Sequence, residues 1–401
     1  MAVNVIPQQQ PFTAEFKESL LKIPEGDRIL SCLQCACCSG ACPFGFAMDF
    51  PPGRMIAWMR AGILDEMLKS DSIWMCVSCY ACTEVCPKDI PITLALMTRA
   101  KEEALLAGNV PAELQSALEF SQQYSNPLGE SSRKRAAWAE ELDFEVPIVR
   151  KEKRPFDVLW FVGDYASYHP RVKEITKAFA KLLHKLGIDF CILGPDEHSD
   201  GDSQRLAGER GLFEMLAEKN AKMLSRCEFN EIITTDPHAY NALKNEYPQL
   251  GFEFPVRHYT EFLVDNLEKI SSLLKENGKP KVAYHDPCYL GRVNKIYDAP
   301  RQLIEAIPGI ELIEMDHNKT TSLCCGGGGG GMWLDGFRWE KAESRLSEWR
   351  VKEAAAVKAD ILAVACPYEP PRFEDATKAI AGAENIVVKD IIELLVDAMD
   401  I

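Results

Sequence analysis

Nine of the fifteen cysteines in this 401-residue chain lie between Cys32 and Cys86. Residues 32–43 read CLQCACCSGACP and residues 76–87 read CVSCYACTEVCP, so the spacing C-x2-C-x2-C-x3-C-P occurs twice. A disulfide framework would spread pairs of cysteines along the chain, and an odd total cannot pair completely. This clustering favours ligation of metal ions or metal clusters, and it constrains the fold of residues 32–87 more than any other feature.

The repeated spacing is the signature of ferredoxins with two 4Fe-4S clusters, in which three closely spaced thiolates hold one cluster and the fourth ligates the other. We therefore predict one cluster on Cys32, Cys35, Cys38 and Cys86, and a second on Cys76, Cys79, Cys82 and Cys42. Two zinc knuckles, or buried thiols without a metal, are the alternative. Cys37 fits neither set and is predicted to be a small packed residue.

The segment between the two motifs predicts a helix. After Pro51-Pro52-Gly53, apolar residues recur at helical spacing, namely Met55, Ile56, Met59, Ile63, Leu64, Met67 and Leu68. A methionine-rich stripe of this kind is predicted to pack in the core rather than to contact a cofactor. Because this connection is longer and more helical than the turn of a small bacterial ferredoxin, the domain resembles the all-helical ferredoxin of respiratory iron-sulfur subunits.

Charge and hydropathy exclude several classes of function. Lys and Arg total 45 against 60 for Asp and Glu, a net charge of -15, which disfavours a nucleic-acid partner or an anionic membrane surface. The sequence has no run of eighteen apolar residues, so direct membrane insertion is not expected. Residues 1–25 also lack the apolar region of a signal peptide. The predicted location is cytoplasmic, where disulfides are rare.

Residues 156–401 have a different pattern. Short β-branched runs at 158–162, 232–235, 282–284 and 361–365 alternate with helical stretches, which predicts mainly parallel, helix-covered sheets. The two halves also match each other: Gly163-Asp164-Tyr165 corresponds to Pro287-Cys288-Tyr289, and Thr235-Asp236-Pro237 to Ala365-Cys366-Pro367. The sequence therefore predicts an internal repeat.

The second copy of the repeat carries Cys288, Cys324, Cys325 and Cys366. Cys288 and Cys366 each follow a predicted strand, so they lie at the carboxyl ends of a parallel sheet, where open α/β folds place ligand sites. Six glycines, Gly326 to Gly331, follow the vicinal pair, and a backbone without side chains can approach a bulky cofactor and direct N–H groups at it. We predict a third cluster on these four thiols, with Gly326, Gly327 and Gly328 against it. A flexible loop, a phosphate cradle, a vicinal disulfide and a single zinc ion are alternatives.

These residues resemble a known family. The segments YHDPCYLGR at 284–292, CCG at 324–326 and ACP at 365–367 resemble the cysteine-rich CCG domain of heterodisulfide reductases, and IWMCVSCY at 73–80 is similar to the ferredoxin part of the same enzymes. The resemblance covers nearly the whole chain. It implies an anaerobic-type iron-sulfur subunit that passes electrons through two 4Fe-4S clusters to a cluster held by the CCG domain, which is either 4Fe-4S or non-cubane.

The sequence departs from the family pattern at two places. The family's CCG unit usually ends in Cys-Pro-x-Cys, whereas Glu369 stands at the last position here. Glu369 could bind iron through oxygen, but four cysteines holding the cluster alone is the favoured interpretation. In the first copy, Asp164, Ser199-Asp200, Asp236 and Ala239 stand where the family has cysteines. Three carboxylates suggest a site for a hard cation, although drift after loss of a cluster explains them better.

Few other residues are candidates for chemistry. His285 is the one histidine beside a cluster loop, where it could donate to sulfur or carry a proton, although packing or a supporting hydrogen bond is favoured. Cys191 and Cys227 are predicted core thiols. No nucleotide fingerprint is present, so a participating flavin would belong to another chain.

The predicted architecture is α+α/β, with an N-terminal all-helical two-cluster ferredoxin domain followed by two repeated CCG-type α/β subdomains. The predicted ranges are a tail at 1–25, the ferredoxin domain at 26–105, a helical linker at 106–155, a degenerate CCG repeat at 156–275 and a cluster-binding CCG repeat at 276–401. The predicted function is electron transfer within a heterodisulfide reductase-like, electron-bifurcating oxidoreductase complex whose partner subunits include a flavoprotein. The resemblance extends to subunits that accompany dissimilatory sulfite reduction and to the electron-input subunit of tungsten-type benzoyl-CoA reductases. A disulfide or thiol reductase acting at the CCG cluster and a structural zinc scaffold are the alternatives.

Overall fold

The computed structural model describes residues 23–401 except 62, 64, 153 and 277, so most of the predicted tail lies outside the described residues. The chain forms two compact units, which are described separately. Unit 1 takes the described residues up to Leu114 together with Arg205–Glu209 and Gly328–Arg345. Unit 2 takes Gln115–Gln204, Arg210–Gly327 and Leu346–Ile401. The units are thus not consecutive ranges, because unit 1 includes part of the C-terminal half.

Unit 1 is helical, and its described residues contain no strand. Its α-helices are α2 (Cys37–Gly40), α3 (Pro52–Arg60), α4 (Asp65–Lys69), α5 (Ser72–Met75), α6 (Ala81–Glu84), α7 (Arg99–Leu106), α17 (Asp335–Ala342) and the start of α8 (Ala112–Tyr124). A 3₁₀ turn covers Gly26–Ser31, and a π-helical turn, Thr93–Thr98, leads into α7. This agrees with the predicted all-helical ferredoxin.

The prediction of one continuous helix between the two cysteine motifs is wrong. The structure has two helices, α3 and α4, instead of one. Gly62, which costs about 1 kcal/mol in a helix interior, lies between them in the sequence, and both it and Leu64 lie outside the described residues. Met55, Ile56, Met59 and Met67 are fully buried, which confirms that the methionine stripe packs in the core.

Unit 2 contains two parallel four-stranded sheets with the same strand order, β2-β1-β3-β4 and β6-β5-β7-β8. The strands of the first copy are β1 (Phe156–Phe161), β2 (Phe190–Ile192), β3 (Phe229–Thr234) and β4 (Val256–His258). Those of the second copy are β5 (Lys281–Tyr284), β6 (Glu311–Ile313), β7 (Ile361–Val364) and β8 (Val387–Asp390). The identical order confirms the internal repeat, with β1 equivalent to β5 and β3 to β7.

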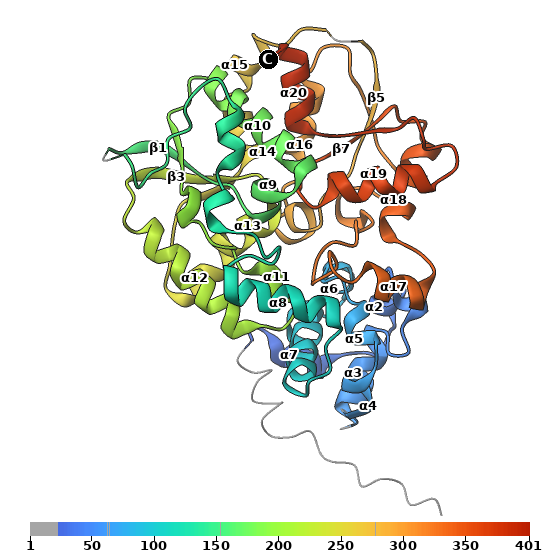
Figure 1. The fold of residues 1–401 in the computed structure, drawn as a ribbon. Helices are drawn as coiled ribbons and strands as arrows, with labels where there is room; N and C mark the ends of the chain where they lie inside the picture. The colour runs from blue at the N-terminus through green and yellow to red at the C-terminus, as the bar shows by residue number, and fades with distance from the viewer. Residues whose placement is uncertain (1–22, 62, 64, 153, 277) are drawn as a thin grey trace, which may run out of the picture. The chain divides into compact units, whose positions relative to one another are not determined.

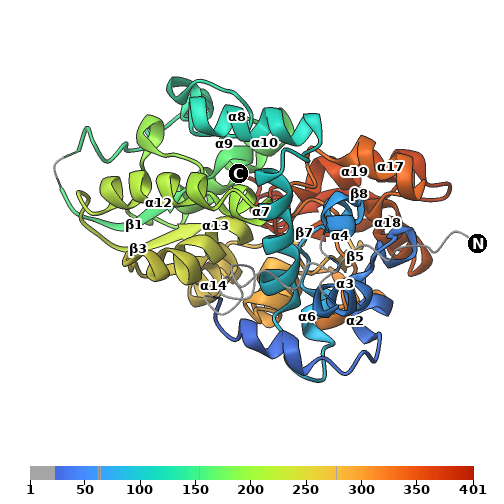
Figure 2. The ribbon, with the colours of Figure 1, turned by 90° about the horizontal axis from the view of Figure 1, so that it is seen from below.

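The helices of unit 2 connect and cover these strands (Figures 1 and 2). The first copy has α9 (Asp164–Tyr168), α10 (Pro170–Lys185), α11 (Asp202–Leu206), α12 (Arg210–Leu224), α13 (Pro237–Asn241), α14 (Tyr259–Asp265) and α15 (Leu267–Ser271). The second copy has α16 (Asp298–Glu305), α18 (Leu346–Ala356), α19 (Glu369–Ala379) and α20 (Ile391–Met399), with a π-helical turn, Tyr289–Val293, in the place of α9.

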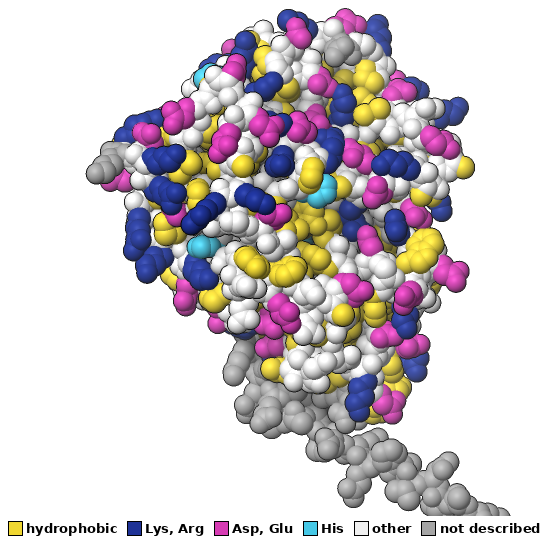
Figure 3. Space-filling view, in the orientation of Figure 1, with side chains coloured by type: hydrophobic (Ala, Val, Ile, Leu, Met, Phe, Trp, Pro, Cys, Tyr) yellow, Lys and Arg dark blue, Asp and Glu magenta, His cyan; other side chains and the backbone are white. Residues whose placement is uncertain are grey.

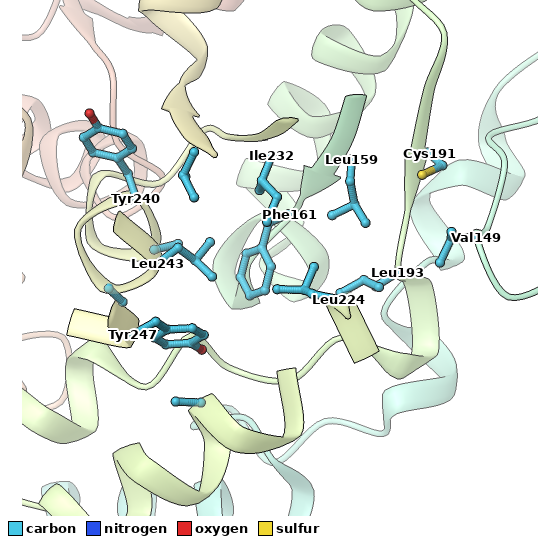
Figure 4. Packing of buried hydrophobic residues seen from close by; sticks show 14 of the residues in the cluster. Val149, Leu159, Phe161, Cys191, Leu193, Leu224, Ile232, Tyr240, Leu243 and Tyr247 are labelled. Carbon is cyan, nitrogen blue, oxygen red and sulfur yellow. The ribbon is translucent and has the colours of Figure 1, made fainter. Parts of the chain in front are cut away.

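Each sheet is buried on both faces, so its strands are nearly continuous apolar runs. In the first copy, Leu159 and Phe161 of β1 and Ile232 of β3 meet Leu224 of α12 and Leu243 in one core (Figure 4). Full burial of each such side chain stabilises the fold by roughly 1.5–3 kcal/mol. A second core, which includes Leu362, Val364 and Phe373, fills the other copy.

The two copies pack together through two equivalent contacts, α10 against α20 and α16 against α14, because α16 is the counterpart of α10 and α20 that of α14. Arg171 of α10 joins them with ion pairs to Glu374 of α19 (2.5 Å) and Glu393 of α20 (2.8 Å). This pairing of equivalent elements relates the copies by an approximate two-fold axis. The loops after β1 and β3 are therefore the counterparts of the cysteine loops after β5 and β7.

Acidic and basic side chains are interspersed over the described residues on the face drawn in Figure 3. None of the helices in the described part of the chain combines the length and apolarity needed to cross a bilayer.

Candidate metal centres

The two ferredoxin motifs exchange their fourth cysteines in the structure. Cys32, Cys35, Cys38 and Cys86 line one cavity of unit 1. Cys42, Cys76, Cys79 and Cys82 line another. The structure thus brings together the same two sets of four thiols that the spacing predicts.

The backbone around each first cysteine adopts the same strained form. Gln34 and Ser78, two residues after Cys32 and Cys76, have left-handed φ angles of 57° and 51° although neither is glycine. The Gln34 N–H then donates to Cys32 Sγ at 3.4 Å, and the Ser78 N–H donates to Cys76 Sγ at 3.3 Å. Each motif continues into a short helix, and these helices, α2 and α6, pack side by side (Figure 2). Backbone strain that directs N–H groups at sulfur is typical of a functional site.

The thiol chemistry of the second cavity fits a cluster. Burial, followed by the neighbouring Cys79, Cys82 and Cys76 thiols, raises the pKa of Cys42 well above its usual value. Converging buried thiolates repel one another, and bound iron supplies the positive charge that lets them ionise together. The four thiols are therefore suited to hold an iron-sulfur cluster.

The remaining cysteines separate into core and surface residues. Cys191 is fully buried in the core of the first copy, as predicted. Cys227 is partly buried against the same core, and its thiol lies 3.2 Å from the Met223 carbonyl oxygen. The prediction for Cys37 is wrong, because this residue is exposed at the start of α2, where its side chain hydrogen-bonds to Cys35.

The CCG cysteines lie in unit 2, where Cys288 follows β5, Cys366 follows β7, and Cys324 and Cys325 lie in the loop after β6. Cys288, Cys324, Cys325 and Cys366 are all buried. The Gly326 N–H donates to Cys324 Sγ at 3.3 Å, and the Gly327 N–H donates to Cys325 Sγ at 3.5 Å. Gly328 belongs to unit 1, where its carbonyl accepts from Gly331 N at 2.9 Å. Two of the three predicted glycines therefore direct N–H groups at thiols.

Glu369 and His285 meet beside Cys325. One ligand atom from each of these three buried residues lies within 4.8 Å of the other two. His285 Nε2 is 3.1 Å from Glu369 Oε1, and Arg350 Nε donates to His285 Nδ1 at 2.9 Å. Because Nδ1 accepts, Nε2 is the protonated nitrogen; it lies near the carboxylate, although the geometry there is not that of a hydrogen bond. The structure thus joins two residues that the sequence offered as separate candidates.

The charges around Cys325 favour its ionised form. A hydrogen bond from Cys324, then His285 and Arg372, hold the pKa of the Cys325 thiol well below its usual value despite burial. Burial raises the pKa of the Glu369 carboxyl to about 7, and His285 opposes this shift. Thiolate is the form that binds metal, so Cys325 is prepared for ligation.

The first copy places carboxylates where the second has thiols. Asp164, Asp200 and Asp236 are all buried. Arg135 donates to Asp164 Oδ1 at 2.5 Å and to Glu197 Oε1 at 2.8 Å, so a guanidinium supplies positive charge at this site. Among the described residues, the one group of three or more potential ligands within 4.8 Å is the His285 group in the second copy. The geometry therefore does not favour the cation site that the sequence suggested for the first copy.

Aromatic rings lie between the two sets of loops. His238, two residues after Asp236, stacks on Tyr289, which follows Cys288, with ring centroids 4.0 Å apart. The two-fold equivalent contact joins Tyr368 to Tyr165, with centroids 4.8 Å apart. The first copy thus faces the cysteine site with packed rings rather than with a second set of thiols.

We expect Glu369→Cys to change the electron paramagnetic resonance (EPR) spectrum of the CCG-held cluster and to leave the two ferredoxin clusters unchanged. The reason is the approach of the Glu369 carboxylate to Cys325, within 4.8 Å. Ala239→Cys is the matched control, because Ala239 is the buried equivalent in the first copy. An unchanged spectrum for Glu369→Cys would exclude Glu369 from the site.

Asp236→Asn is expected to leave the iron content unchanged. The Asp236 side chain caps α13 by accepting from His238 N at 2.8 Å, and asparagine caps a helix equally well. Iron analysis of purified protein checks this result. A loss of several iron atoms per chain would show that the first copy holds a cluster.

Sequence reasoning missed the buried cations. Arg135 and Trp138 belong to the predicted helical linker, yet both are buried, and Trp138 packs on Trp160 of β1 with ring centroids 5.3 Å apart. Arg350 lies on α18 and Arg372 on α19, far in sequence from the histidine and thiol that they serve. No local pattern identifies such residues, because their partners come from other elements.

Comparison with known families also separates a ferredoxin part from two α/β copies. Residues 28–90 match the 4Fe-4S dicluster domain, and residues 158–244 and 282–368 each match the cysteine-rich CCG domain. The dicluster domain gives the chain two 4Fe-4S clusters, and CCG domains of heterodisulfide reductase-like proteins bind a further iron-sulfur cluster.

Several curated proteins are similar to most of this chain. The chain is 34% identical to the probable iron-sulfur-binding oxidoreductase FadF of Bacillus subtilis, over 90% of this chain and 50% of the relative. It is 32% identical to the EtfAB:quinone oxidoreductase of Syntrophomonas wolfei, over 85% of this chain and 48% of the relative.

A third relative is one of the subunits of the dihydromethanophenazine:CoB--CoM heterodisulfide reductase of Methanosarcina barkeri, with 32% identity over 69% of this chain and 66% of the relative. The chain spans about half the length of the first two relatives. The chain therefore belongs to the heterodisulfide reductase-like iron-sulfur oxidoreductases, which join a 4Fe-4S dicluster domain to a pair of CCG domains.

Proposed function

We propose that this chain is the electron-transfer part of an oxidoreductase complex, in which single electrons pass between the two ferredoxin clusters and a third cluster held by the second CCG copy. The observation that carries this proposal is the grouping of the thiols. Two cavities are each lined by four cysteines from both ferredoxin motifs, and a further four buried cysteines lie in the CCG loops.

The proposed ligands are the twelve cysteines at positions 32, 35, 38, 42, 76, 79, 82, 86, 288, 324, 325 and 366. Bound clusters would supply one-electron redox chemistry. The chain itself supplies the thiolates, the N–H groups of Gln34, Ser78, Gly326 and Gly327 that point at sulfur, and burial of the CCG site. Such hydrogen bonds and burial set the reduction potential of a cluster.

The partners are other subunits of the complex, including a flavoprotein as electron donor or acceptor. One relative is named EtfAB:quinone oxidoreductase, which supports an exchange of electrons with a separate redox protein. A cytoplasmic location, electron bifurcation and a role with a sulfite-reducing or benzoyl-CoA-reducing enzyme stay predictions from the sequence.

A second candidate is direct reduction of a disulfide or thiol substrate at the CCG site. The vicinal Cys324 and Cys325, with the lowered pKa of the Cys325 thiol, favour it. The packing of His238 on Tyr289 disfavours it, because rings occupy the side of the first copy that faces this site.

Turnover experiments distinguish the two candidates. The chain is purified anaerobically, alone and with the proteins that co-purify, and reduction of a small disulfide is measured with an artificial electron donor. The relay predicts turnover only with the co-purifying subunits. Catalytic disulfide reduction by the isolated chain would overturn the relay and support the reductase.

A further inference from the structure

The two ferredoxin sites differ in the charge buried beside them. Each first cysteine of a motif has a backbone carbonyl that accepts a hydrogen bond from a cationic side chain. At Cys32 the donor is Arg60, an exposed residue, with Nη1 2.9 Å from the carbonyl oxygen. At Cys76 the donors are Lys101, at 3.0 Å, and Arg338, at 3.2 Å, both of which are buried.

Lys101 is held in its charged form by its partners. Besides Cys76 O, its Nζ donates to Leu206 O at 3.1 Å and to Gly329 O at 2.9 Å. Three carbonyl acceptors use the three N–H groups of an ammonium, whereas a neutral amine has only two. A fourth, longer contact joins Nζ to Ser78 Oγ at 3.5 Å. All of these partners are neutral oxygens and Lys101 makes no ion pair with any described residue, so its positive charge lies next to Cys76.

Arg338 adds a second positive charge at the same site. Its Nε and Nη2 donate to Trp74 O at 3.2 and 3.1 Å, and its guanidinium lies over the Phe44 ring, 5.9 Å from the centroid. Phe44 itself lines the cavity of Cys42, Cys76, Cys79 and Cys82. The second site is therefore flanked by two buried cations, and the first by two exposed ones, Arg60 and Lys88.

Buried charges act more strongly than exposed ones, because water and salt screen an exposed charge. Reduction adds one negative charge to a cluster, so a nearby buried cation favours the reduced form and raises the reduction potential. We propose that Lys101 and Arg338 make the cluster of Cys42, Cys76, Cys79 and Cys82 the higher-potential member of the pair, and hence the one that holds the electron when the pair carries one.

This inference depends on the proposed ligand sets. It identifies Lys101 and Arg338 as residues that act on the cluster through their charge, and their hydrogen bonds to the Cys76 carbonyl hold that charge beside it. Gly329, one of the Lys101 partners, belongs to the glycine run that follows Cys324 and Cys325 in the sequence, so the same ammonium also holds part of that run.

The test is an EPR redox titration of the anaerobically purified chain. The two ferredoxin signals are assigned with variants that each lack one ligand, Cys79→Ala and Cys35→Ala. In the unaltered chain, the signal that Cys79→Ala removes is expected to have the higher midpoint potential. An equal or lower potential would overturn the inference, whereas absence of two clusters would overturn the proposed function instead.

The variant Lys101→Met is expected to shift the electron distribution between the two clusters about tenfold toward the Cys32 set, which is about 59 mV for one electron. Lys101→Arg, which keeps the charge, should leave most of the original electron distribution in place. A purely structural role of the Lys101 side chain would not predict this difference between the two variants. Arg60→Met is the matched control, and it should change the reduction potential of the cluster of the Cys32 set by less. A Lys101→Met protein with both potentials unchanged would contradict the inference, and if this variant does not fold, the potentials of the unaltered chain still decide it.

Discussion

Cys42→Ala is expected to remove the cluster of Cys76, Cys79 and Cys82 and to leave the cluster of the Cys32 set in place. Cys42 belongs to the first motif in sequence, but in the structure it lines the cavity of the second. A cluster that loses one of four thiolates loses its site, so about four iron atoms per chain should disappear with one EPR signal. The measurement is iron analysis with EPR on anaerobically purified protein.

The exchange of cysteines makes this expectation specific. Cys42→Ala and Cys79→Ala should remove the same signal, and Cys86→Ala and Cys35→Ala should remove the other. Cys37→Ala is the matched control, because Cys37 lies within the first motif but lines neither cavity. If Cys42→Ala and Cys35→Ala removed the same signal, each motif would hold its own cluster and the exchange would be contradicted.

Arg135→Met is expected to lower the free energy of unfolding by about 3–5 kcal/mol, the usual cost of leaving buried charges unpaired. Arg135 is 2% exposed and pairs with Asp164 at 2.5 Å and Glu197 at 2.8 Å. The Glu197 carboxylate is also fixed by the N–H groups of Val162 and Gly163, at 2.9 and 2.8 Å. Methionine would leave both carboxylates buried without a cation.

Anaerobic denaturant unfolding, followed by tryptophan fluorescence, measures this effect. Trp138 and Trp160 are fully buried in the same unit and report on it. Arg154→Met is the matched control, because the Arg154–Asp189 pair at 2.6 Å is exposed and such pairs contribute less than about 1 kcal/mol. Equal losses for the two variants would contradict a stabilising network in the first copy.

The decrease in the free energy of unfolding caused by Arg135→Met should also depend on pH. Burial already raises the pKa of Glu197 above its usual value and Arg135 opposes this shift, so loss of the guanidinium would raise the folded-state pKa of Glu197 further. Groups with raised folded pKa values destabilise the fold at high pH and lose this effect as they become protonated. The difference between the variant and the unaltered chain should therefore be larger at neutral pH than in mild acid, and a difference that does not change with pH would contradict this explanation.

Much of the fold followed from local patterns. The two cysteine motifs predicted both thiol sets because their spacing is short and specific, and the matching strands predicted the repeat because parallel strands buried on both faces are continuous apolar runs. The prediction of a single helix between the motifs failed because a spacing of apolar residues does not show where a helix ends: α3 ends at Arg60 and α4 begins at Asp65. Local periodicity thus predicted the presence of helices and strands more accurately than the residues at which they begin and end.

The charged surroundings of the sites could not be predicted in the same way. Lys101 is 25 residues from Cys76 and 228 from Gly329, and Arg350 is 65 from His285. In the sequence these residues look like ordinary solvent-facing charges. Only the tertiary fold shows that they are buried and that their partners are carbonyl oxygens and an imidazole.

The carboxylates of the first copy illustrate the same limit. The sequence showed that Asp164, Asp200 and Asp236 replace thiols, and it left a hard cation or drift as explanations. The structure adds Arg135, from outside the repeat, and a capping role for Asp236. Burial raises the pKa of Asp236 to about 6, which His238 opposes. The replaced ligands have thus become part of a buried polar network.

The central claim is that this chain carries three iron-sulfur clusters on twelve cysteines. Iron and acid-labile sulfide analysis of the anaerobically purified chain, with EPR of the reduced protein, tests it most directly. Three 4Fe-4S clusters would give a brown protein with about twelve iron atoms per chain and three signals. A colourless protein that contains zinc, or one with about eight iron atoms and no signal that Cys325→Ala removes, would contradict it.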